Sequence, residues 1–414
     1  MSKVKIIICG AGSRGAGHAN NAMEHSGNAE IIGVAEPREF HRNELAKKYN
    51  IAPENVFSDW SEMAGRERFA DAVVISTQDS LHVEPAVAFA EKGYHILLEK
   101  PIAPTEKECQ IVTDAVKKAG VIFGVCHVLR YTNYSKKVKE IIDSGALGEI
   151  VSIRHLEPVC YWHQAHSYVR GNWRNEEESS FMLLAKSCHD IDLLHYFMQD
   201  KCTAVSSFGS LKHFKKENKP EGASDRCIDC SVSDDCPYSA SRFYLGRLKK
   251  GETEWPLNVI TPEPTEESVT EALRNGPYGR CVYTCDNDVV DNQVVNMEFA
   301  GGQTVSFTMT AFTDSSGRQT QIFGTRGQLT GDSVKIKVFD FNTEKTTEYD
   351  TSAGSGHITG GHGGGDYNLI SDFIDAVASK DQSKLLSGAD ETLNSHKMVF
   401  AAERSRIEGK VIKL

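Results

Sequence analysis

Two short stretches of this 414-residue chain decide its fold: residues 4–15, VKIIICGAGSRG, and residues 95–101, HILLEKP. In the first, an apolar, isoleucine-rich run leads into a G-x-G-x-x-G turn, the pattern by which a strand and the helix after it prepare a pyrophosphate site. In the second, another apolar run ends in a lysine, where strands of such a sheet meet their ligand. Together the stretches predict a bound dinucleotide with a cationic side chain beside it.

The glycines of the first stretch have separate tasks in such a turn. Gly10 permits the tight bend, Gly12 lets the backbone approach a phosphate, and Gly15 allows the helix to pack closely on the strand. A helix that starts near Ser13 and Arg14 would present its first N–H groups to the pyrophosphate. We therefore expect all five residues to contact the cofactor.

The apolar run that follows the glycine turn helps to choose the cofactor. Ala35 closes that run and Glu36 follows it, 21 residues after Gly15. A carboxylate in this position accepts a hydrogen bond from the ribose 2′-hydroxyl and repels a 2′-phosphate, which favours NAD over NADP. Arg38 could neutralise a 2′-phosphate, so NADP stays open as the less favoured cofactor.

The composition bounds the class of protein. The chain is long enough for two domains, and its 46 basic against 57 acidic residues give a net charge of −11, which argues against a nucleic-acid partner. No apolar run approaches the roughly 20 residues that a bilayer span needs, and no signal peptide fits before the first strand. We therefore expect a cytoplasmic protein without a membrane partner, in which the 11 cysteines are free thiols apart from any metal cluster.

The rhythm of apolar runs divides the chain at about residue 126. Residues 1–126 alternate short apolar runs with amphipathic segments, which predicts an α/β domain with a doubly wound parallel sheet, a Rossmann domain. The expected strands are Val4–Cys9, Ala29–Ala35, Ala72–Ser76, His95–Leu98 and Val121–Val125, and the expected helices are Phe40–Tyr49, Val83–Lys92 and Thr105–Ala119.

Residues 127–414 follow a different rhythm, because from about residue 150 strands succeed one another without helices. This predicts a second α/β domain with a large, mostly antiparallel open sheet. One helix, Phe181–Met198, interrupts it, and a late helix, Asp366–Ser379, is expected to return toward the first domain. The expected strands are Ile150–Leu156, Thr203–Leu211, Gln293–Phe299, Gln303–Ala311, Arg318–Gly324, Val334–Asp340 and Thr346–Tyr349.

A polar stretch of about residues 212–285, punctuated by proline and glycine, is expected to be an insertion. It contains a C-x2-C-x5-C pattern, and a fourth cysteine could complete a metal site. The predicted ligands are Cys227, Cys230, Cys236 and Cys281, with Cys285 as the alternative fourth ligand. Because tetrahedral thiolate sites prefer zinc, we expect a structural zinc ion; an iron–sulfur cluster is less favoured, and reduced thiols stay open.

With Glu99-Lys100-Pro101 in place, nearly the whole chain resembles the Gfo/Idh/MocA family of sugar and cyclitol oxidoreductases. The resemblance is carried by the glycine turn, by residues 76–82 (STQDSLH), by Glu99-Lys100-Pro101 and by a downstream helix with a histidine. It implies a nicotinamide cofactor, with Thr77, His82, Glu99 and Lys100 among the contacts, and a carbohydrate substrate. It also implies a homodimer or homotetramer that associates through the open sheet.

The resemblance assigns the proton chemistry to Lys100 and His189. Hydride loss from a carbinol carbon leaves a developing carbonyl, so the hydroxyl proton needs an acceptor beside the reacting oxygen. The family places an aspartate four residues before the helical histidine, but here that position is Ala185. We therefore expect His189 to act as acid or base. Lys186, three residues before it and on nearly the same helix face, is expected to contact the substrate.

Residues 161–174, YWHQAHSYVRGNWR, are dense in aromatic and hydrogen-bonding side chains, which suits a sugar with hydroxyls and apolar C–H faces. Two further segments contain candidate substrate contacts. One is residues 285–288, which precede an expected strand, and the other is the glycine-rich segment of residues 360–366. The expected substrate contacts are His163, His166, Arg170, Trp173, Asp286 and His362, together with Lys186.

Three functions follow from these patterns. The first is an NAD-dependent oxidoreductase that acts on a ring hydroxyl of a sugar or glycoside, with the C3 hydroxyl as the expected position. The second is a redox-neutral glycosidase that oxidises the sugar transiently, eliminates the aglycone and re-reduces; His163, His166 or His362 could supply its extra base. The third is a non-catalytic dinucleotide-binding regulator, which the presence of both Lys100 and His189 disfavours.

Overall fold

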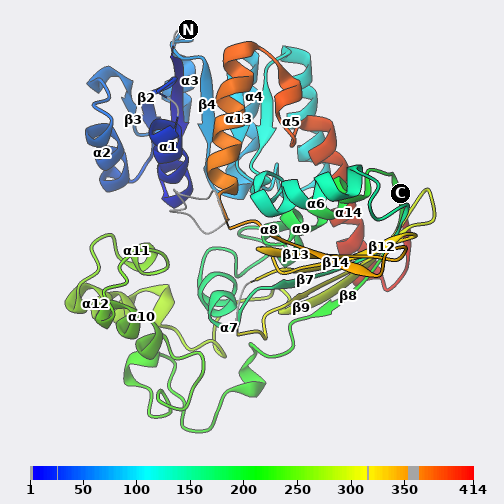
Figure 1. Cartoon of the computed structure of the whole chain (residues 1–414). Coiled ribbons are helices and arrows are strands. Elements are labelled where there is room, and N and C mark those ends of the chain that lie inside the picture. The colour runs from blue at the N-terminus through cyan, green and yellow to red at the C-terminus, as the bar shows by residue number, and fades with distance from the viewer. Residues whose placement is uncertain (1–2, 26, 315–316, 353–362) are drawn as a thin grey trace.

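The computed structural model describes residues 3–25, 27–314, 317–352 and 363–414 and contains two sheets (Figure 1). The first has six parallel strands in the order β3-β2-β1-β4-β5-β6. They are β1 (Val4–Cys9), β2 (Ala29–Ala35), β3 (Val56–Phe57), β4 (Ala72–Ile75), β5 (His95–Leu98) and β6 (Phe123–Val125). This confirms the predicted doubly wound parallel sheet, to which the structure adds the two-residue strand β3.

Helices cover both faces of the first sheet, which explains its continuous apolar runs. Within β1, Ile6 and Ile8 pack on the face of α1, whereas Ile7 packs on the opposite face with α4 and α5; all three are fully buried. The helices of this domain are α1 (Ser13–His25), α2 (Glu39–Lys48), α3 (Trp60–Gly65), α4 (Val83–Glu91) and α5 (Glu106–Ala119). The strand order reverses between β1 and β4, where a doubly wound sheet opens a crevice for a ligand.

Helix α13 (Gly365–Ser379) comes from the C-terminal part of the chain but lies beside α1 (Figure 1). Its buried side chains Leu369 and Phe373 join the same apolar cluster as Ile6 and Ile8 of β1. The first sheet is therefore covered in part by a segment that follows the second sheet in the sequence.

The second sheet has nine strands in the order β14-β13-β12-β11-β7-β10-β9-β8-β15. Neighbouring strands are antiparallel except β7 and β10, which pair in parallel, so the expected mostly antiparallel sheet is confirmed. The strands are β7 (Ile150–Pro158), β8 (Cys202–Ser210), β9 (Asn292–Phe299), β10 (Thr304–Thr310), β11 (Gln319–Gly324), β12 (Gly327–Gly331), β13 (Lys335–Asp340), β14 (Lys345–Asp350) and β15 (Ile412–Lys413). The short strands β12 and β15 were not predicted.

One face of the second sheet packs on helices that join it to the first domain. In β9, Val295, Met297 and Phe299 point into this core, whereas the residues between them face the other side. The covering helices include α9 (Cys188–Met198) and α14 (Ala389–Glu408), and α6 (Asn133–Asp143) lies at the junction of the domains. None of the described helices combines the length and the apolar character that a membrane span requires.

The prediction of one continuous helix over Phe181–Met198 is wrong, because the structure has two helices there. The structure has α8 (Met182–Ala185) and α9, with a break at residues 186–187. In a continuous helix the carbonyl of Ala185 would accept the N–H of residue 189, but here it accepts a hydrogen bond from Lys100 Nζ. Lys186 therefore does not share a helix face with His189, and this expectation is corrected.

The segment between β8 and β9 contains a small separate apolar core. The helices α10 (Ala240–Lys249), α11 (Leu257–Ile260) and α12 (Glu266–Asn275) pack around Tyr244, Leu257 and Leu273, which are fully buried. Figure 1 shows these helices to one side of the two sheets. The short helix α7 (Tyr161–His163) and the π-helical segment Gln164–Arg170 lie next to this insertion.

Candidate cofactor and substrate site

The glycine turn lies at the reversal of the strand order, and two of its positions exclude a side chain. A Cβ on Gly10, whose φ is +89°, would lie 2.6 Å from the carbonyl oxygen of Ser76, and one on Gly15 would lie 1.9 Å from the carbonyl oxygen of Gly10. Helix α1 begins at Ser13, so its first N–H groups lie at the end of this turn. The turn therefore has the shape of an anion cradle next to a helix N-terminus.

Glu36 lies directly beside the glycine turn and is buried. Its carboxylate accepts the N–H of Ala11 at 2.8 Å, the N–H of Arg38 at 3.0 Å and the guanidinium of Arg38 at 2.8 Å. Burial alone would raise the pKa of Glu36, but the hydrogen bonds from Arg38 and Ala11 lower it. The structure thus places an ionised carboxylate at the position predicted to meet the ribose, with Arg38 paired to it.

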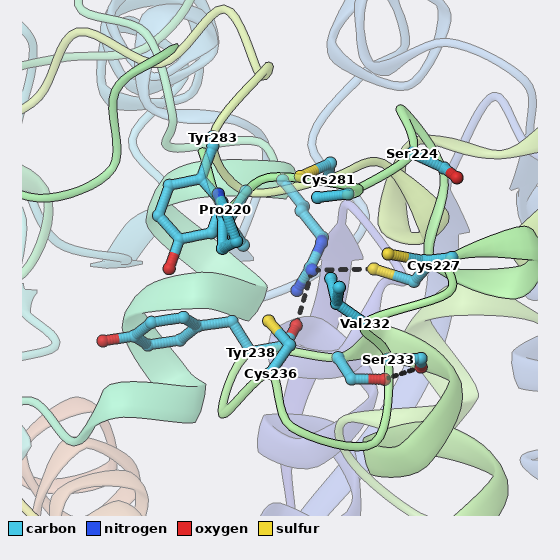
Figure 2. A pocket seen from close by; sticks show the side chains of 14 residues that line it. Pro220, Ser224, Cys227, Val232, Ser233, Cys236, Tyr238, Cys281 and Tyr283 are labelled. Carbon is cyan, nitrogen blue, oxygen red and sulfur yellow. Dashed lines mark hydrogen bonds between the residues drawn. The ribbon is translucent and has the colours of Figure 1, made fainter. Parts of the chain in front are cut away.

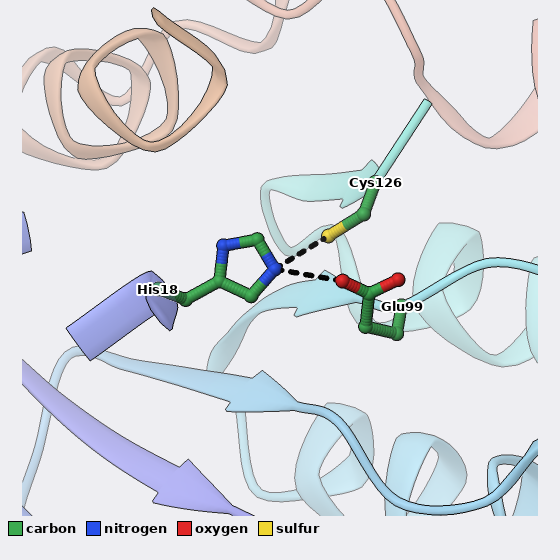
Figure 3. Close-up of side chains that lie close together, drawn as sticks. All are labelled: His18, Glu99 and Cys126. Atoms are coloured by element: carbon green, nitrogen blue, oxygen red, sulfur yellow. Dashed lines mark hydrogen bonds and ion pairs between the residues drawn. The ribbon is translucent and has the colours of Figure 1, made fainter. Parts of the chain in front are cut away.

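Arg14 and His18 both bind Glu99 behind the turn, and Figure 3 shows the contact between His18 and Glu99. Arg14 Nε donates to Glu99 Oε1 at 2.6 Å, and His18 Nε2 lies 2.8 Å from the same oxygen. Another nitrogen of Arg14 donates to Asp366 on α13 at 2.6 Å, which ties the turn to that helix. Burial alone would raise the pKa of Glu99, but Arg14 and His18 hold it well below its usual range.

Figure 3 shows that Cys126 also points at His18, with Sγ 3.6 Å from Nε2. The ligand atoms of His18, Glu99 and Cys126 lie within 4.8 Å of one another, a spacing that could hold a metal ion. However, the guanidinium of Arg14 already binds Glu99 Oε1, so a cation neutralises this carboxylate. The group fits a buried ion-pair network that fixes the backbone before Lys100.

His82 joins the loops that follow β4 and β5. Its ring is fully buried, with Nδ1 2.7 Å from the carbonyl oxygen of Pro101 and Nε2 3.2 Å from that of Thr77. The Lys100–Pro101 peptide bond is cis. Thr77 and His82, both predicted as cofactor contacts, thus hold the segment that carries Lys100.

Lys100 reaches from the end of β5 to the second domain. Its Nζ donates to the carbonyl oxygen of Ala185 at the end of α8, and its charge acts on the fully buried ring of His127 and on the partly exposed ring of His163. His189 stands in the first turn of α9 and is 6% exposed, with its ring centroid 5.6 Å from that of His127. Both predicted proton-handling residues are therefore found where the two domains meet.

Asp79 is a residue of this site that the sequence analysis did not assign. It is buried in the loop after β4, and Ser179 Oγ lies 3.5 Å from its carboxylate. Burial raises its pKa, against the opposing effects of His82, Lys100 and the hydrogen bond to Trp173. Asp79 could have been identified from the sequence, because it is an acidic residue just past the carboxyl end of an expected strand of the parallel sheet.

Lys186 enters a chain of buried charges on the second sheet. Its Nζ lies 3.0 Å from Glu157 Oε1, and Arg318 Nε lies 2.8 Å from Glu157 Oε2 and 2.6 Å from Asp190 Oδ1. His155 Nε2 is 3.1 Å from the same Asp190 oxygen. The signal that could have found Glu157 and His155 is their position: both lie on the inward face of β7, where an apolar residue is expected.

His163 lies in α7 and its ring is close to two aromatic rings. The ring centroid of Trp255 is 5.1 Å away and that of Tyr168 5.8 Å away. Burial, with the nearby charge of Lys186, holds the pKa of His163 well below its usual range. Trp173 lies 6.2 Å from Tyr168, so these aromatic groups form one side of the region around Lys100 and Lys186.

Two family models match this chain. The one described as an oxidoreductase family with an NAD-binding Rossmann fold matches residues 4–127, and the one described as the C-terminal alpha/beta domain of an oxidoreductase family matches residues 139–414. The chain belongs to the Gfo/Idh/MocA family of oxidoreductases. Membership confirms the resemblance seen in the glycine turn and in Glu99-Lys100-Pro101.

Several relatives of this Gfo/Idh/MocA oxidoreductase have names that include a sugar. The chain is 26% identical to YteT of Bacillus subtilis (strain 168) over 405 residues, 93% of this chain and 92% of that protein. It is also 26% identical to a 2,7-anhydro-N-acetylneuraminate hydratase of Mediterraneibacter gnavus over 270 residues, 65% of this chain and 67% of the relative. A solved levoglucosan dehydrogenase in complex with NADH and levoglucosan has the same fold, with a TM-score of 0.71 at 19% identity over 100% of this chain and 99% of that one.

Two of the predicted substrate contacts, His166 and Arg170, form hydrogen bonds with residues of the insertion. His166 Nδ1 lies 2.6 Å from the hydroxyl of Tyr244 in the insertion, and burial lowers the pKa of His166 to about 3. Arg170 donates to the carbonyl oxygens of Arg280 and Tyr238, both at 2.7 Å. Both side chains thus connect residues 161–174 to the insertion, and we leave them out of the substrate set.

Asp286 and His362 complete the predicted substrate contacts. The Asp286 carboxylate binds Arg174 at 2.9 Å and Arg280 at 2.6 Å, and hydrogen bonds from Arg174, followed by those from Arg280, hold its pKa well below the usual range. This half-exposed ion pair fastens two loops together. His362 lies outside the described residues.

The predicted metal ligands come together in the insertion (Figure 2). Cys227, Cys230, Cys236 and Cys281 all line one small cavity next to Arg170. Cys285 is not among the residues that line it; its Sγ lies 3.3 Å from the carbonyl oxygen of Cys281. The cysteine spacing in the sequence thus corresponds to a spatial cluster.

Proposed function

We propose that this oxidoreductase transfers hydride between NAD and a ring hydroxyl of a sugar or glycoside. The observation that carries the proposal is the position of Lys100, which lies at the end of β5 near the glycine turn and reaches Ala185 of the second domain. A cation there is close to the cofactor edge of the sheet and to the side chains that could hold a substrate.

The residues of the first domain fit a dinucleotide. The backbone of Gly10, Gly12 and the start of α1 would bind the pyrophosphate, and Glu36 would accept hydrogen bonds from the adenosine ribose. The bound nicotinamide ring would supply the hydride acceptor or donor. The lowered pKa of Glu36 keeps it negative, which supports NAD over NADP.

Lys100 and His189 would divide the proton chemistry. The ammonium of Lys100 would bind the reacting oxygen and stabilise the negative charge that develops on it. His189 would accept the hydroxyl proton during oxidation and return it during reduction. Asp79, buried close to Lys100, would help to position the lysine.

The substrate would lie between aromatic and charged side chains. Trp173 and Tyr168 offer faces for the apolar side of a sugar ring, and Lys186 and His163 offer polar groups for its hydroxyls. The levoglucosan and anhydro-sialic-acid substrates in the names of relatives belong to this chemical class.

The test is the formation of NADH by the purified chain with NAD across a panel of sugars and aryl glycosides. Net NADH with one class of sugar would support the proposal and identify its substrate class. NADP should be used at least roughly fivefold less efficiently than NAD, which corresponds to about 1 kcal/mol. Substrate turnover that needs neither nucleotide would contradict the proposal.

A redox-neutral reaction is the second candidate. It needs a base for the proton alpha to a transient ketone, and His163, whose low pKa keeps it neutral, is close to both Lys100 and Lys186. The name of the hydratase relative denotes addition or removal of water without net redox change. Release of an aglycone without net NADH in the same panel would favour this candidate over the first.

We also propose that the chain forms a homodimer or homotetramer through the outer face of the second sheet. This face carries exposed apolar side chains that are paired across neighbouring strands, Phe208 on β8 and Val294 on β9. Exposed apolar groups of this kind mark interaction surfaces when they lie together. Light scattering on the purified chain tests this, and Phe208→Glu should shift a larger assembly to the monomer.

A reducing compartment such as the cytoplasm is the location we propose. All 11 cysteines lie in the described ranges, none of them forms a disulfide there, and most are buried. Stable disulfides are typical of oxidising compartments instead. Cell fractionation with an antibody against the chain would test this location.

A further inference from the structure

Four cysteine side chains from distant parts of the insertion meet at one cavity (Figure 2). Cys227 begins a short 3-10 turn, Cys230 follows it, and Cys236 comes six residues later. Cys281 comes from the other side of α10, α11 and α12, and the N–H of Cys281 donates to the carbonyl of Asp225 at 2.8 Å. The backbone thus brings the fourth thiol to the first three.

The spacing of the sulfur atoms does not suit a single zinc ion. Zinc–thiolate bonds are about 2.3 Å long, so two sulfurs on one zinc lie at most about 4.6 Å apart. Among the described residues, the group of three or more metal-ligating side chains whose ligand atoms all lie within 4.8 Å of one another is His18, Glu99 and Cys126, not any three of these cysteines. The cysteines are gathered, but more widely than one ion requires.

A multi-iron cluster accounts for this wider spacing. In such a cluster each cysteine binds a different iron, so the thiolates surround the cluster instead of meeting at one point. The third cysteine is followed by Pro237, as is the last cysteine of bacterial ferredoxin motifs. The cysteine pattern by itself favours zinc, so it is the spacing of the sulfur atoms that favours the cluster.

Arg170 provides the charge that such a centre needs. Its guanidinium, which is buried, lines the cavity and donates toward Cys227 Sγ at 3.5 Å. A cluster with four thiolate ligands is anionic overall, and the buried arginine offsets that charge.

We propose that Cys227, Cys230, Cys236 and Cys281 bind a [4Fe–4S] cluster, with Arg170 as a hydrogen-bond donor to Cys227. Each thiol releases its proton when it binds iron. Arg170 ends the segment Gln164–Arg170, which follows His163 directly, so the cluster would brace one wall of the proposed substrate region. Its role would be structural, and it does not depend on the proposed hydride transfer.

The test is chemical analysis of the full chain purified without oxygen. We expect about four iron and four acid-labile sulfide per chain, little zinc, and the broad visible absorption of thiolate-bound iron. One zinc per chain without sulfide would overturn the proposal, as would a failure to bind iron after anaerobic incubation with ferrous iron and sulfide. These measurements need no variant and no substrate.

Two cysteine variants test the ligand set. Cys236→Ser should reduce the iron content at least fourfold, whereas Cys285→Ser, the matched control outside the cavity, should leave it unchanged. If Cys285→Ser removed the iron and Cys281→Ser did not, the proposed ligand set would be wrong. Circular dichroism of each variant shows whether the fold is kept.

Discussion

Two buried carboxylates lie close to Lys100, and their surroundings differ. Glu99, the residue before the lysine, is bound by Arg14 and His18, both through the same oxygen. Asp79, in the neighbouring loop after β4, has the hydroxyl of Ser179 at 3.5 Å. The first carboxylate is neutralised by the guanidinium of Arg14, and the second is buried with weaker partners.

Their pKa values move in opposite directions for this reason. Burial would raise both, but Arg14 and His18 reverse the effect at Glu99. At Asp79 burial prevails over the attraction of His82 and Lys100, and the pKa rises. Neighbouring acids with separated pKa values can take separate roles: Glu99 is suited to hold the backbone, and Asp79 is suited to exchange a proton.

The largest expected effect is on stability, from Glu99→Ala. It removes the carboxylate that His18 and Arg14 share, and breaking such a pair costs about 2–4 kcal/mol when one partner, here Arg14, is partly exposed. Urea unfolding measures this loss. Asp79→Asn, which imitates the protonated acid, should change the free energy of unfolding by less than about 1 kcal/mol at neutral pH. An equal loss of stability in both variants would contradict the stated difference between the ion-paired Glu99 and the weakly partnered Asp79.

A third buried carboxylate, Glu36, allows the comparison to be extended to cofactor choice. Glu36→Ser removes the negative charge beside the glycine turn and leaves Arg38 without its partner. We expect discrimination against NADP to fall by about 1–3 kcal/mol, roughly 5- to 150-fold in the ratio of kcat/KM values. Kinetics with both nucleotides measure it, and an unchanged ratio would exclude Glu36 from the cofactor site.

The smallest expected effect is the pH dependence of stability, which should have opposite signs at the two acids. The lowered pKa of Glu99 gives stability that is present above the unfolded pKa of about 4 and is lost as the pH falls through the native value. The raised pKa of Asp79 favours folding below about pH 4, and this contribution is lost as the pH rises through the native value.

Unfolding of two variants between pH 3 and pH 8, roughly the range of stable folding, separates the two signs. Glu99→Gln should approach the parent chain in stability as the pH falls, whereas Asp79→Asn should gain on it as the pH rises. Parallel curves for parent and variants would mean that neither acid changes its pKa on folding.

The parts of the molecule that short sequence patterns specify could be predicted. The bounds of β1, β2 and β5 agree with the apolar runs, because a strand buried on both faces has a continuous apolar sequence. The C-x2-C-x5-C pattern likewise predicted that these cysteines lie together, and they line one cavity. The strands β3, β12 and β15 were not predicted, because two to five residues give too short a pattern.

Features that depend on distant residues could not be predicted. The break between α8 and α9 follows from the hydrogen bond of Lys100 to Ala185 and the ion pair of Lys186 with Glu157, and both partners are far away in the sequence. The orientation of the Arg170 side chain depends on its hydrogen bonds to two backbone carbonyl groups of the insertion. A helical or loop pattern does not contain this information.

The central claim is that Lys100 binds the reacting oxygen beside a nicotinamide cofactor. The most direct test is Lys100→Ala, with kcat and NAD affinity measured on the same preparation, and Lys337→Ala, an exposed lysine of β13, as the control. We predict a loss in kcat of roughly 10³-fold or more, with NAD affinity within about threefold and the control unchanged. Turnover close to that of the parent chain would contradict the account and remove Lys100 from the chemistry.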